Sequence, residues 1–296
     1  MRAEIETIQQ MMEKADYVTD PAIATSVHLA MTLRKPLLIE GHTGVGKTEI
    51  AKVMARMLGT NLIRLQCYEG LDAAQALYEW NYPKQLLHIK LEEATTHTLR
   101  EKEATIFSEP FLIRRPLLQA ISQDGKPPVL LIDEVDRSDE EFEAFLLEVL
   151  AEFQVTIPEI GTIKTAHPPY VILTSNRVRE LSDALRRRCL YLWIDFPGFE
   201  KEVRIVTRKV PGVNEALARE ISRFMEGLRT MRLSKVPGVA ESLDWAQALA
   251  SLHADHLDED LVLETLGCVL KDADDIKRFK RELTSSGLKR FAAAEG

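Results

Sequence analysis

The stretch 41–48, which reads Gly-His-Thr-Gly-Val-Gly-Lys-Thr, constrains the fold of this chain more than any other part of the sequence. It matches the pattern G-x-x-x-x-G-K-[ST], in which the glycines let the backbone wrap closely around phosphate groups. An apolar stretch, Leu37–Glu40, comes before it, and apolar residues at helical spacing follow it as far as Leu58. This order of strand, loop and helix directs the loop amides and the helix dipole toward an anion. The pattern therefore predicts a nucleotide-binding α/β core.

The predicted contacts to the nucleotide come from this stretch and from the residue after it. Lys47 is expected to reach the β- and γ-phosphates, and the hydroxyl of Thr48 is expected to hold Mg²⁺. The predicted nucleotide-binding residues are Gly41, His42, Thr43, Gly44, Val45, Gly46, Lys47, Thr48 and Glu49. A glycine-rich turn without function is the alternative, and the flanking strand and helix argue against it.

A second acidic motif follows the apolar stretch Val129–Ile132, which is typical of a buried strand. Asp133 is expected to bind Mg²⁺ directly or through water, and Glu134 to polarise the attacking water. An adjacent acidic pair is weak evidence on its own, because an acidic strand end can simply face solvent. Together with the phosphate loop, it predicts an enzyme that hydrolyses ATP to ADP and phosphate with Mg²⁺.

The rest of the chain is organised around these two motifs. A capping box is expected at Ser138 and Glu141, ahead of an apolar helix face. The expected strands are Leu37–Glu40, Leu62–Cys67, Val129–Ile132, Tyr170–Thr174 and Leu190–Phe196, with a hairpin over Gln154–Lys164. Strands alternate with helices up to residue 197, and the remainder is mainly helical. We predict an α/β core with a parallel sheet over residues 1–197 and a smaller helical lid over 198–296.

Composition narrows the class of protein. The net charge of -8 argues mildly against a general nucleic-acid binder, although it leaves room for a local basic groove. The longest apolar stretches are too short to span a bilayer, and acidic residues interrupt the N-terminal MRAEIETIQQ where a signal peptide needs an apolar core. We therefore expect a cytoplasmic protein without a membrane partner. The three scattered cysteines, Cys67, Cys189 and Cys268, fit buried thiols better than a zinc or disulfide framework.

Five motifs carry a resemblance to a known family. They are GHTGVGKT at 41–48, LLIDEVDR at 130–137, IPEIGTIK at 157–164, LTSN at 173–176 and ALRRRC at 184–189. Together they resemble the AAA+ ATPases, within them the MoxR group, and most closely its CoxD-like branch. The resemblance implies a ring, expected to be a hexamer, that uses ATP hydrolysis to remodel a protein client. It also implies a von Willebrand A domain partner and a role in metalloenzyme maturation.

The resemblance assigns roles to further residues. Asn176 is similar to the sensor-1 residue that positions the attacking water, although a turn residue after a strand would also fit. One of Arg186, Arg187 and Arg188 is expected to be the arginine finger that reaches the neighbouring protomer's γ-phosphate. Arg188 is favoured and Arg187 comes second, whereas Arg186 fits a solvated helix end. Val18 resembles a residue that flanks the adenine base, which packing of the first two helices would explain almost as well.

Two segments remain open at this stage. Leu71–Leu87 resembles an insert that projects toward the pore or the partner, but its aromatic residues Trp80 and Tyr82 would also fit core or surface-loop positions. The stretch Ala240–Ala246 lacks the sensor-2 arginine that MoxR-like proteins often have there, and Arg232 or Lys235 would have to replace it.

Two other functions compete with the chaperone hypothesis. A nucleic-acid motor is one of them, because related restriction NTPases share this core and the three arginines, while the acidic pI of about 5.5 weighs against it. A scaffold that binds ATP but scarcely hydrolyses it is the other, and the intact Glu134 and Asn176 argue against that function.

Overall fold

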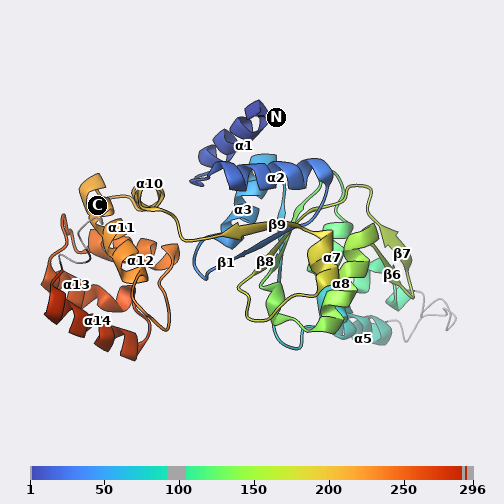
Figure 1. The fold of residues 1–296 in the computed structure, drawn as a ribbon. Coiled ribbons are helices and arrows are strands. Elements are labelled where there is room, and N and C mark those ends of the chain that lie inside the picture. The colour runs from blue at the N-terminus through green and yellow to red at the C-terminus, as the bar shows by residue number, and fades with distance from the viewer. Residues whose placement is uncertain (1, 92–104, 289–290, 292–296) are drawn as a thin grey trace. The chain divides into compact units, whose positions relative to one another are not determined.

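The computed structural model describes residues 2–91, 105–288 and 291, and its centre is a five-stranded sheet (Figure 1). The strands are β1 (Leu37–Gly41), β2 (Leu62–Gln66), β5 (Val129–Asp133), β8 (Tyr170–Ser175) and β9 (Leu190–Ile194), and their order is β2-β5-β8-β1-β9. The pairs β2–β5, β5–β8 and β8–β1 are parallel. Every residue of β1 and β5 is buried, which explains their nearly continuous apolar sequences.

Helices precede, follow and connect these strands. In the first part of the chain they are α1 (Arg2–Lys14), α2 (Pro21–Leu33), α3 (Lys47–Leu58), α4 (Ala73–Leu77), α5 (Tyr82–Leu91), α7 (Pro116–Ile121), α8 (Glu140–Glu152) and α9 (Asp183–Arg188). The C-terminal part has α10 (Phe199–Lys209), α11 (Glu215–Arg229), α12 (Val239–Ser251), α13 (Glu259–Thr265) and α14 (Ala273–Ser286). The short 3-10 turns are η1 (Glu109–Phe111), η2 (Val135–Arg137) and η3 (Leu266–Cys268). The predicted fold class, a parallel α/β core followed by a helical region, is confirmed.

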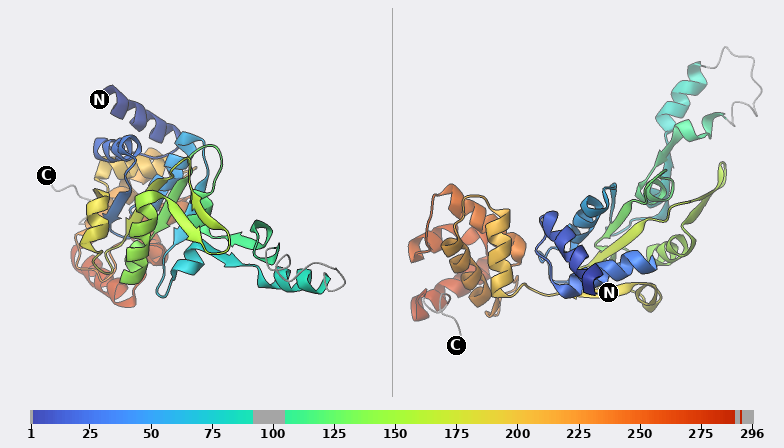
Figure 2. Two further views of the ribbon diagram at one scale, coloured as in Figure 1. Left: turned by 90° about the vertical axis from the view of Figure 1, so that its right-hand side faces the viewer. Right: turned by 90° about the horizontal axis from the view of Figure 1, so that it is seen from above.

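Two small two-stranded antiparallel sheets lie outside the main sheet. The predicted hairpin over residues 154–164 is confirmed as β6 (Gln154–Ile157) and β7 (Gly161–Lys164). The other small sheet pairs β3 (Tyr78–Trp80) with β4 (Leu112–Arg114). Figure 2 shows α5, next to this small sheet, extending away from the main sheet. Trp80 is buried in the hydrophobic core cluster, whereas Tyr82 is 60% exposed, so the first is a core aromatic and the second a surface one.

The chain divides into two compact units that are interleaved along the sequence. The sheet unit comprises residues 1–8, 21–40 and 51–192, and the helical unit comprises residues 9–20, 41–50 and 193–296. The helical unit has its own core, in which Phe224 packs against Trp245, Phe279 and Phe291. Because the units are interleaved, the division into residues 1–197 and 198–296 stays a prediction.

The start of α8 differs from the predicted capping box. Asp139 is the N-cap, and its carboxylate accepts a hydrogen bond from the Phe142 amide at 2.8 Å. The Ser138 hydroxyl instead donates to the Val135 carbonyl at 2.7 Å, closing the turn of η2. The prediction of Ser138 as the cap was therefore wrong by one residue, because the preceding turn already uses its hydroxyl.

None of the helices in the described ranges combines the length and the apolar composition that crossing a membrane requires.

Candidate functional site

The phosphate loop, residues 41–48, joins β1 to α3 and belongs to the helical unit. Gly44 and Gly46 have φ angles of 78° and 93°, in the left-handed region that favours glycine. At Gly41 a Cβ atom would lie 2.1 Å from the Ile194 carbonyl oxygen, so a side chain cannot fit there. The Lys47 ammonium donates to the carbonyls of Gly41 and His42 at 2.8 and 2.7 Å. The loop is thus closed on itself around the lysine, an arrangement that fits a polyphosphate ligand.

An aromatic cluster surrounds the second residue of this loop. The His42 ring stacks on Phe196 with a centroid distance of 4.5 Å and meets the edge of Trp193 at 5.7 Å. Its Nε2 atom lies 3.8 Å from the Asp195 carboxylate. These contacts, which sequence reasoning missed, join the loop to the chain segment that follows β9.

The N-terminus of α12 also contacts the loop, within the same helical unit. The Ala240 amide donates to the Gly44 carbonyl at 3.1 Å, and a Cβ atom on Gly238 would lie 2.6 Å from the Thr43 carbonyl oxygen. Backbone groups therefore connect α12 to the loop in the stretch that lacks a sensor-2 arginine. Arg232 and Lys235 are both exposed, and the choice between them as replacements stays a prediction.

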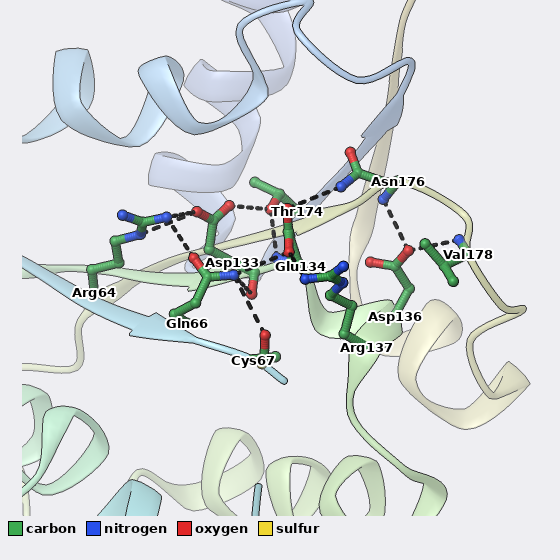
Figure 3. A network of polar contacts seen from close by, with 10 residues as sticks. All are labelled: Arg64, Gln66, Cys67, Asp133, Glu134, Asp136, Arg137, Thr174, Asn176 and Val178. Carbon is green, nitrogen blue, oxygen red and sulfur yellow. Dashed lines mark hydrogen bonds and ion pairs between the residues drawn. The ribbon is translucent and has the colours of Figure 1, made fainter. Parts of the chain in front are cut away.

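A carboxylate cluster lies at the carboxyl end of β5 in the sheet unit (Figure 3). Asp133 is 3% exposed, and one of its oxygens accepts a hydrogen bond from the Thr174 hydroxyl on β8. Glu134 follows in the left-handed region, with φ 54° and ψ 49°, which is uncommon for a residue with a side chain. Its amide donates to the Thr174 hydroxyl oxygen at 2.9 Å. One hydroxyl thus holds both halves of the acidic pair.

The carboxylate of Glu134 is oriented by three side chains. Gln66 and Asn176 each donate from the side-chain amide at 3.2 Å, one to each carboxylate oxygen. Arg137 lies 3.3 Å from the same oxygen that Gln66 contacts. The structure therefore brings together Glu134 and Asn176, which the sequence predicted as a general base and a water-positioning residue.

Two polar residues of β2 that sequence reasoning missed also belong to this cluster. Arg64 donates to Asp133 through Nε at 3.1 Å and to the side-chain oxygen of Gln66. Residues i and i+2 of a strand face the same side, and Gln66 is in register with Asp133 across the parallel pair. The signal was visible in the sequence as two polar residues at alternate positions of an apolar strand.

Asp136, which is 1% exposed, holds the loop that follows β8. Its carboxylate accepts hydrogen bonds from the amides of Asn176 and Val178 at 3.1 and 2.7 Å. Cys67 lies next to this cluster, and burial, with a further contribution from Asp133, raises the pKa of its thiol to about 12. A thiol with that pKa stays protonated near neutral pH, so Cys67 is not a nucleophile.

The three arginines of α9 have different surroundings. Arg188 donates to the Leu147 carbonyl of α8, and Arg187 is exposed, with no side-chain partner in the described part of the chain. The side chain of Arg186 is 37% exposed, and its guanidinium lies 3.6 Å from the carboxylate of Glu40. Arg186 is thus a partly solvated residue at the helix end that also faces a buried carboxylate, a contact that sequence reasoning missed.

The remaining predicted site residues lie in the helical unit. Val18 is 5% exposed and lines an open pocket of about 340 Å³, together with Val203 and Thr207 of α10. The hydroxyl of Thr48 in the helical unit and the carboxylate of Asp133 in the sheet unit are each hard oxygen donors, the kind of ligand that Mg²⁺ prefers. Within the described ranges, no group of three or more His, Cys, Asp or Glu side chains could hold a metal by itself.

Comparison with known proteins gives one family. Residues 36–189, just over half of the chain, match the AAA domain family, dynein-related subfamily. Uncharacterized proteins of Staphylococcus haemolyticus and Staphylococcus epidermidis are each 25% identical to the chain, over 248 and 240 residues. These alignments cover 81% and 79% of this chain and 86% and 82% of the relatives.

Solved structures show the same fold. Two mutants of RuvB from Thermotoga maritima match with TM-scores of 0.51 and 0.50, at sequence identities of 17% and 18%. The matches cover 99% and 98% of this chain and 79% and 78% of the RuvB chains. At these identities the similarity establishes the arrangement of strands and helices.

Proposed function

The chain belongs to the AAA domain family, dynein-related subfamily, and on this premise we propose that it is an ATPase that works as a ring, expected to be a hexamer. In this proposal the phosphate loop binds the nucleotide, and the carboxylate cluster supplies the groups that activate water. The observation that supports it most is the orientation of Glu134, whose two oxygens are held by Gln66 and Asn176. A carboxylate held in this way can accept a proton from water in a defined direction.

Each residue then has one task in the reaction. The loop amides and Lys47 bind the β- and γ-phosphates of ATP, and Glu49 and Val18 lie next to the bound nucleotide. Thr48 and Asp133 would hold Mg²⁺, which would neutralise charge on the phosphates. Water attacks the γ-phosphorus, the bond to the β,γ-bridging oxygen breaks, and Glu134 takes the proton of the water, which Asn176 helps to orient.

The arginine finger is proposed to come from α9 of the neighbouring protomer. The predicted order was Arg188 first and Arg187 second. The geometry favours the reverse order, because Arg188 already donates to a carbonyl of its own chain, whereas the side chain of Arg187 has no partner in the described part of the chain. A finger acting in trans makes the isolated protomer nearly inactive, so turnover should rise steeply with protein concentration.

The biological role is proposed from the resemblance to MoxR proteins of the CoxD-like branch. Hydrolysis would shift protomers against one another and remodel a protein client in the cytoplasm. A von Willebrand A domain partner and a metalloenzyme client are the expected associates. We also propose that residues 198–296 act as the lid over the nucleotide. A pull-down that recovers a von Willebrand A domain protein would support this role, and its failure would weaken it.

Substitutions at the two motifs test the enzymatic proposal. Lys47→Ala should abolish nucleotide binding, whereas Glu134→Gln should bind ATP and lose roughly 100-fold or more in turnover. Glu141→Gln, at an exposed position of α8, is a matched control that should hydrolyse at the parent rate. Turnover by Glu134→Gln at the parent rate would show that another group activates the water.

A mixing experiment tests action in trans. Lys47→Ala protomers have an intact finger and an inactive site, and Arg187→Ala protomers have the reverse defect. Each variant alone should be inactive, with a loss of roughly 10³-fold for Arg187→Ala, and a mixture of the two should recover turnover. Arg188→Ala takes the place of Arg187→Ala if the predicted order was correct.

The nucleic-acid motor is tested by turnover with and without DNA. RuvB is described as a Holliday junction branch migration motor, and DNA-stimulated turnover would favour a function of that class here.

A further inference from the structure

Glu40 is a buried charged residue that the reaction described above does not use. It is the last residue of β1 before Gly41, and it is 2% exposed. A buried carboxylate is stable only with hydrogen bonds or opposite charges around it. Its Oε2 atom accepts a hydrogen bond from the Tyr191 hydroxyl at 3.0 Å and lies 3.6 Å from Arg186 and 3.9 Å from Arg177.

These three partners come from elements far apart in the chain. Arg177 follows Asn176 directly and has a left-handed backbone, with φ 59°. Arg186 is in the last turn of α9, next to Arg187, and Tyr191 is on the edge strand β9. The Arg186 guanidinium also lies over the Tyr191 ring at 5.8 Å. One carboxylate therefore joins the water-positioning loop, the arginine helix and the edge of the sheet.

The helix α9 depends on such external support. It has six residues, too few for a helix that is stable by itself. At its start, the Ser182 hydroxyl accepts a hydrogen bond from the Leu185 amide, and the Ser182 amide donates to the buried carboxylate of Glu143 at 2.9 Å. At its end, the last turn carries three consecutive arginines and so a high density of positive charge. The carboxylate of Glu40 lies 3.6 Å from the guanidinium of Arg186 and so supplies a negative charge next to that turn.

We propose that Glu40 is a positioning residue that holds the last turn of α9 through Arg186 and so directs the adjacent arginines toward the neighbouring protomer. This inference rests on the proposed function, because it concerns the finger that acts in trans. Burial, followed by the hydrogen bond to Glu40, raises the pKa of Tyr191.

Glu40→Gln removes the charge and keeps the shape, and the amide oxygen can still accept the Tyr191 hydrogen bond. We expect nucleotide affinity within about twofold of the parent and turnover reduced about tenfold or more, because the finger is misdirected. A fall in nucleotide affinity that matched the fall in turnover would contradict a role in positioning the finger.

Mixing two variant protomers separates the ability to donate a finger from the activity of the nucleotide site. Mixed with Lys47→Ala protomers, which have an intact finger, Glu40→Gln protomers should regain turnover at their own sites. Mixed with Arg187→Ala protomers, which need a finger, Glu40→Gln protomers should give no recovery. Recovery in the second mixture, or none in the first, overturns the proposal. A merely structural defect would weaken both mixtures equally.

The reference mixture of Lys47→Ala with Arg187→Ala tests the ring mechanism separately from the role of Glu40. If this mixture also stays inactive when Arg188→Ala replaces Arg187→Ala, the ring mechanism itself fails. If it recovers and Glu40→Gln behaves as the parent in every assay, only the inference about Glu40 fails.

Two controls guard against simple misfolding. Glu202→Gln removes an equally buried carboxylate that pairs with Arg229 in the helical unit, and it should still donate a finger in the mixing assay. Arg186→Gln alters the partly exposed partner and should reproduce the mixing behaviour of Glu40→Gln. Because both changes break the same contact, the double variant should lose no more turnover than the worse single variant. Additive losses would contradict action through Arg186.

Discussion

The negative charges of two buried glutamates, Glu202 in the helical unit and Glu40 in the sheet unit, are compensated in different ways. Glu202 meets Arg229 through two hydrogen bonds, of 2.6 and 2.8 Å, and the arginine side chain is 9% exposed. Glu40 has two arginines at 3.6 and 3.9 Å, and their side chains are 37% and 54% exposed. The first pair is bidentate and almost fully desolvated, whereas the second is a longer, partly solvated contact in which two cations share one carboxylate.

The difference matches the surroundings of the two pairs. Glu202 on α10 joins α11 and α12, because it also accepts a hydrogen bond from the Ser242 hydroxyl, and these helices form the core of the helical unit. Glu40 ends β1 and faces Arg186 of α9 and Arg177 after β8, at longer distances and with more solvent around the cations. We therefore expect the loss of one cation to lower the free energy of unfolding less at Glu40 than at Glu202. This contrast leads to four predictions.

The largest expected effect is the loss of the bidentate pair. Arg229→Ala leaves Glu202 buried without a cation, which should lower the free energy of unfolding by about 3–5 kcal/mol in chemical denaturation. Lys277→Ala, which removes an exposed ion pair with Asp274, is the control and should change stability little. A small effect of Arg229→Ala would remove the distinction between the two glutamates.

A smaller effect is expected at the longer, partly solvated contact. Arg186→Ala should lower the free energy of unfolding by about 1–2 kcal/mol, because Arg177 still faces the Glu40 carboxylate and the removed side chain is partly exposed. Removal of both arginines should cost more than the sum of the single changes, since the second removal leaves the carboxylate without a cation. Strict additivity would mean that the two arginines act independently.

Tyr191→Phe should have a still smaller effect. It removes one hydrogen bond to Glu40, from a tyrosine that is 51% exposed, and should cost about 1 kcal/mol in a denaturation experiment. Turnover should fall less than in Glu40→Gln, because Arg186 keeps its attraction to the carboxylate. A larger loss of turnover in Tyr191→Phe would make the tyrosine the main support of α9.

The smallest expected effect is a change in the free energy of unfolding at alkaline pH. The pKa of Tyr191 is raised in the folded protein by burial and by Glu40, so above about pH 10 the unfolded phenol ionises while the folded one keeps its proton. The folded state then binds more protons, and stability falls as pH rises. Tyr191→Phe should reduce this alkaline loss of stability, measured as the difference between the two pH profiles. An identical slope would show that the environment of Tyr191 does not favour its neutral form.

Much of the fold followed from local patterns. The strand before residue 41, the helix after it and the buried strand ending at Asp133 were all predicted within a few residues, because apolar periodicity and glycine placement act over short distances. The ends of elements were less accurate. The strand expected to reach Phe196 ends at Ile194, where the chain turns to place Phe196 against His42. A contact between distant residues set that boundary.

The candidate site was predictable only in part. Glu134 and Asn176 could be expected to meet, because the carboxyl ends of parallel strands lie at one edge of a sheet, and they do. Arg64 and Gln66 were missed because their role depends on β2 lying next to β5, which the order of strands along the chain does not reveal. The contact of Arg186 with Glu40 was missed for the same reason, since these two residues are distant in sequence.

The sequence by itself determined the chemistry that this protein can attempt: a loop of glycines and a lysine for phosphates, and an acidic pair after a buried strand. These properties depend on neighbouring residues, so they can be read from the chain. Only the tertiary structure decided which side chains orient Glu134, which arginine of α9 faces a buried carboxylate and which two are exposed. Strand order and register bring those residues together from distant parts of the chain, and both are set by the packing of the whole sheet.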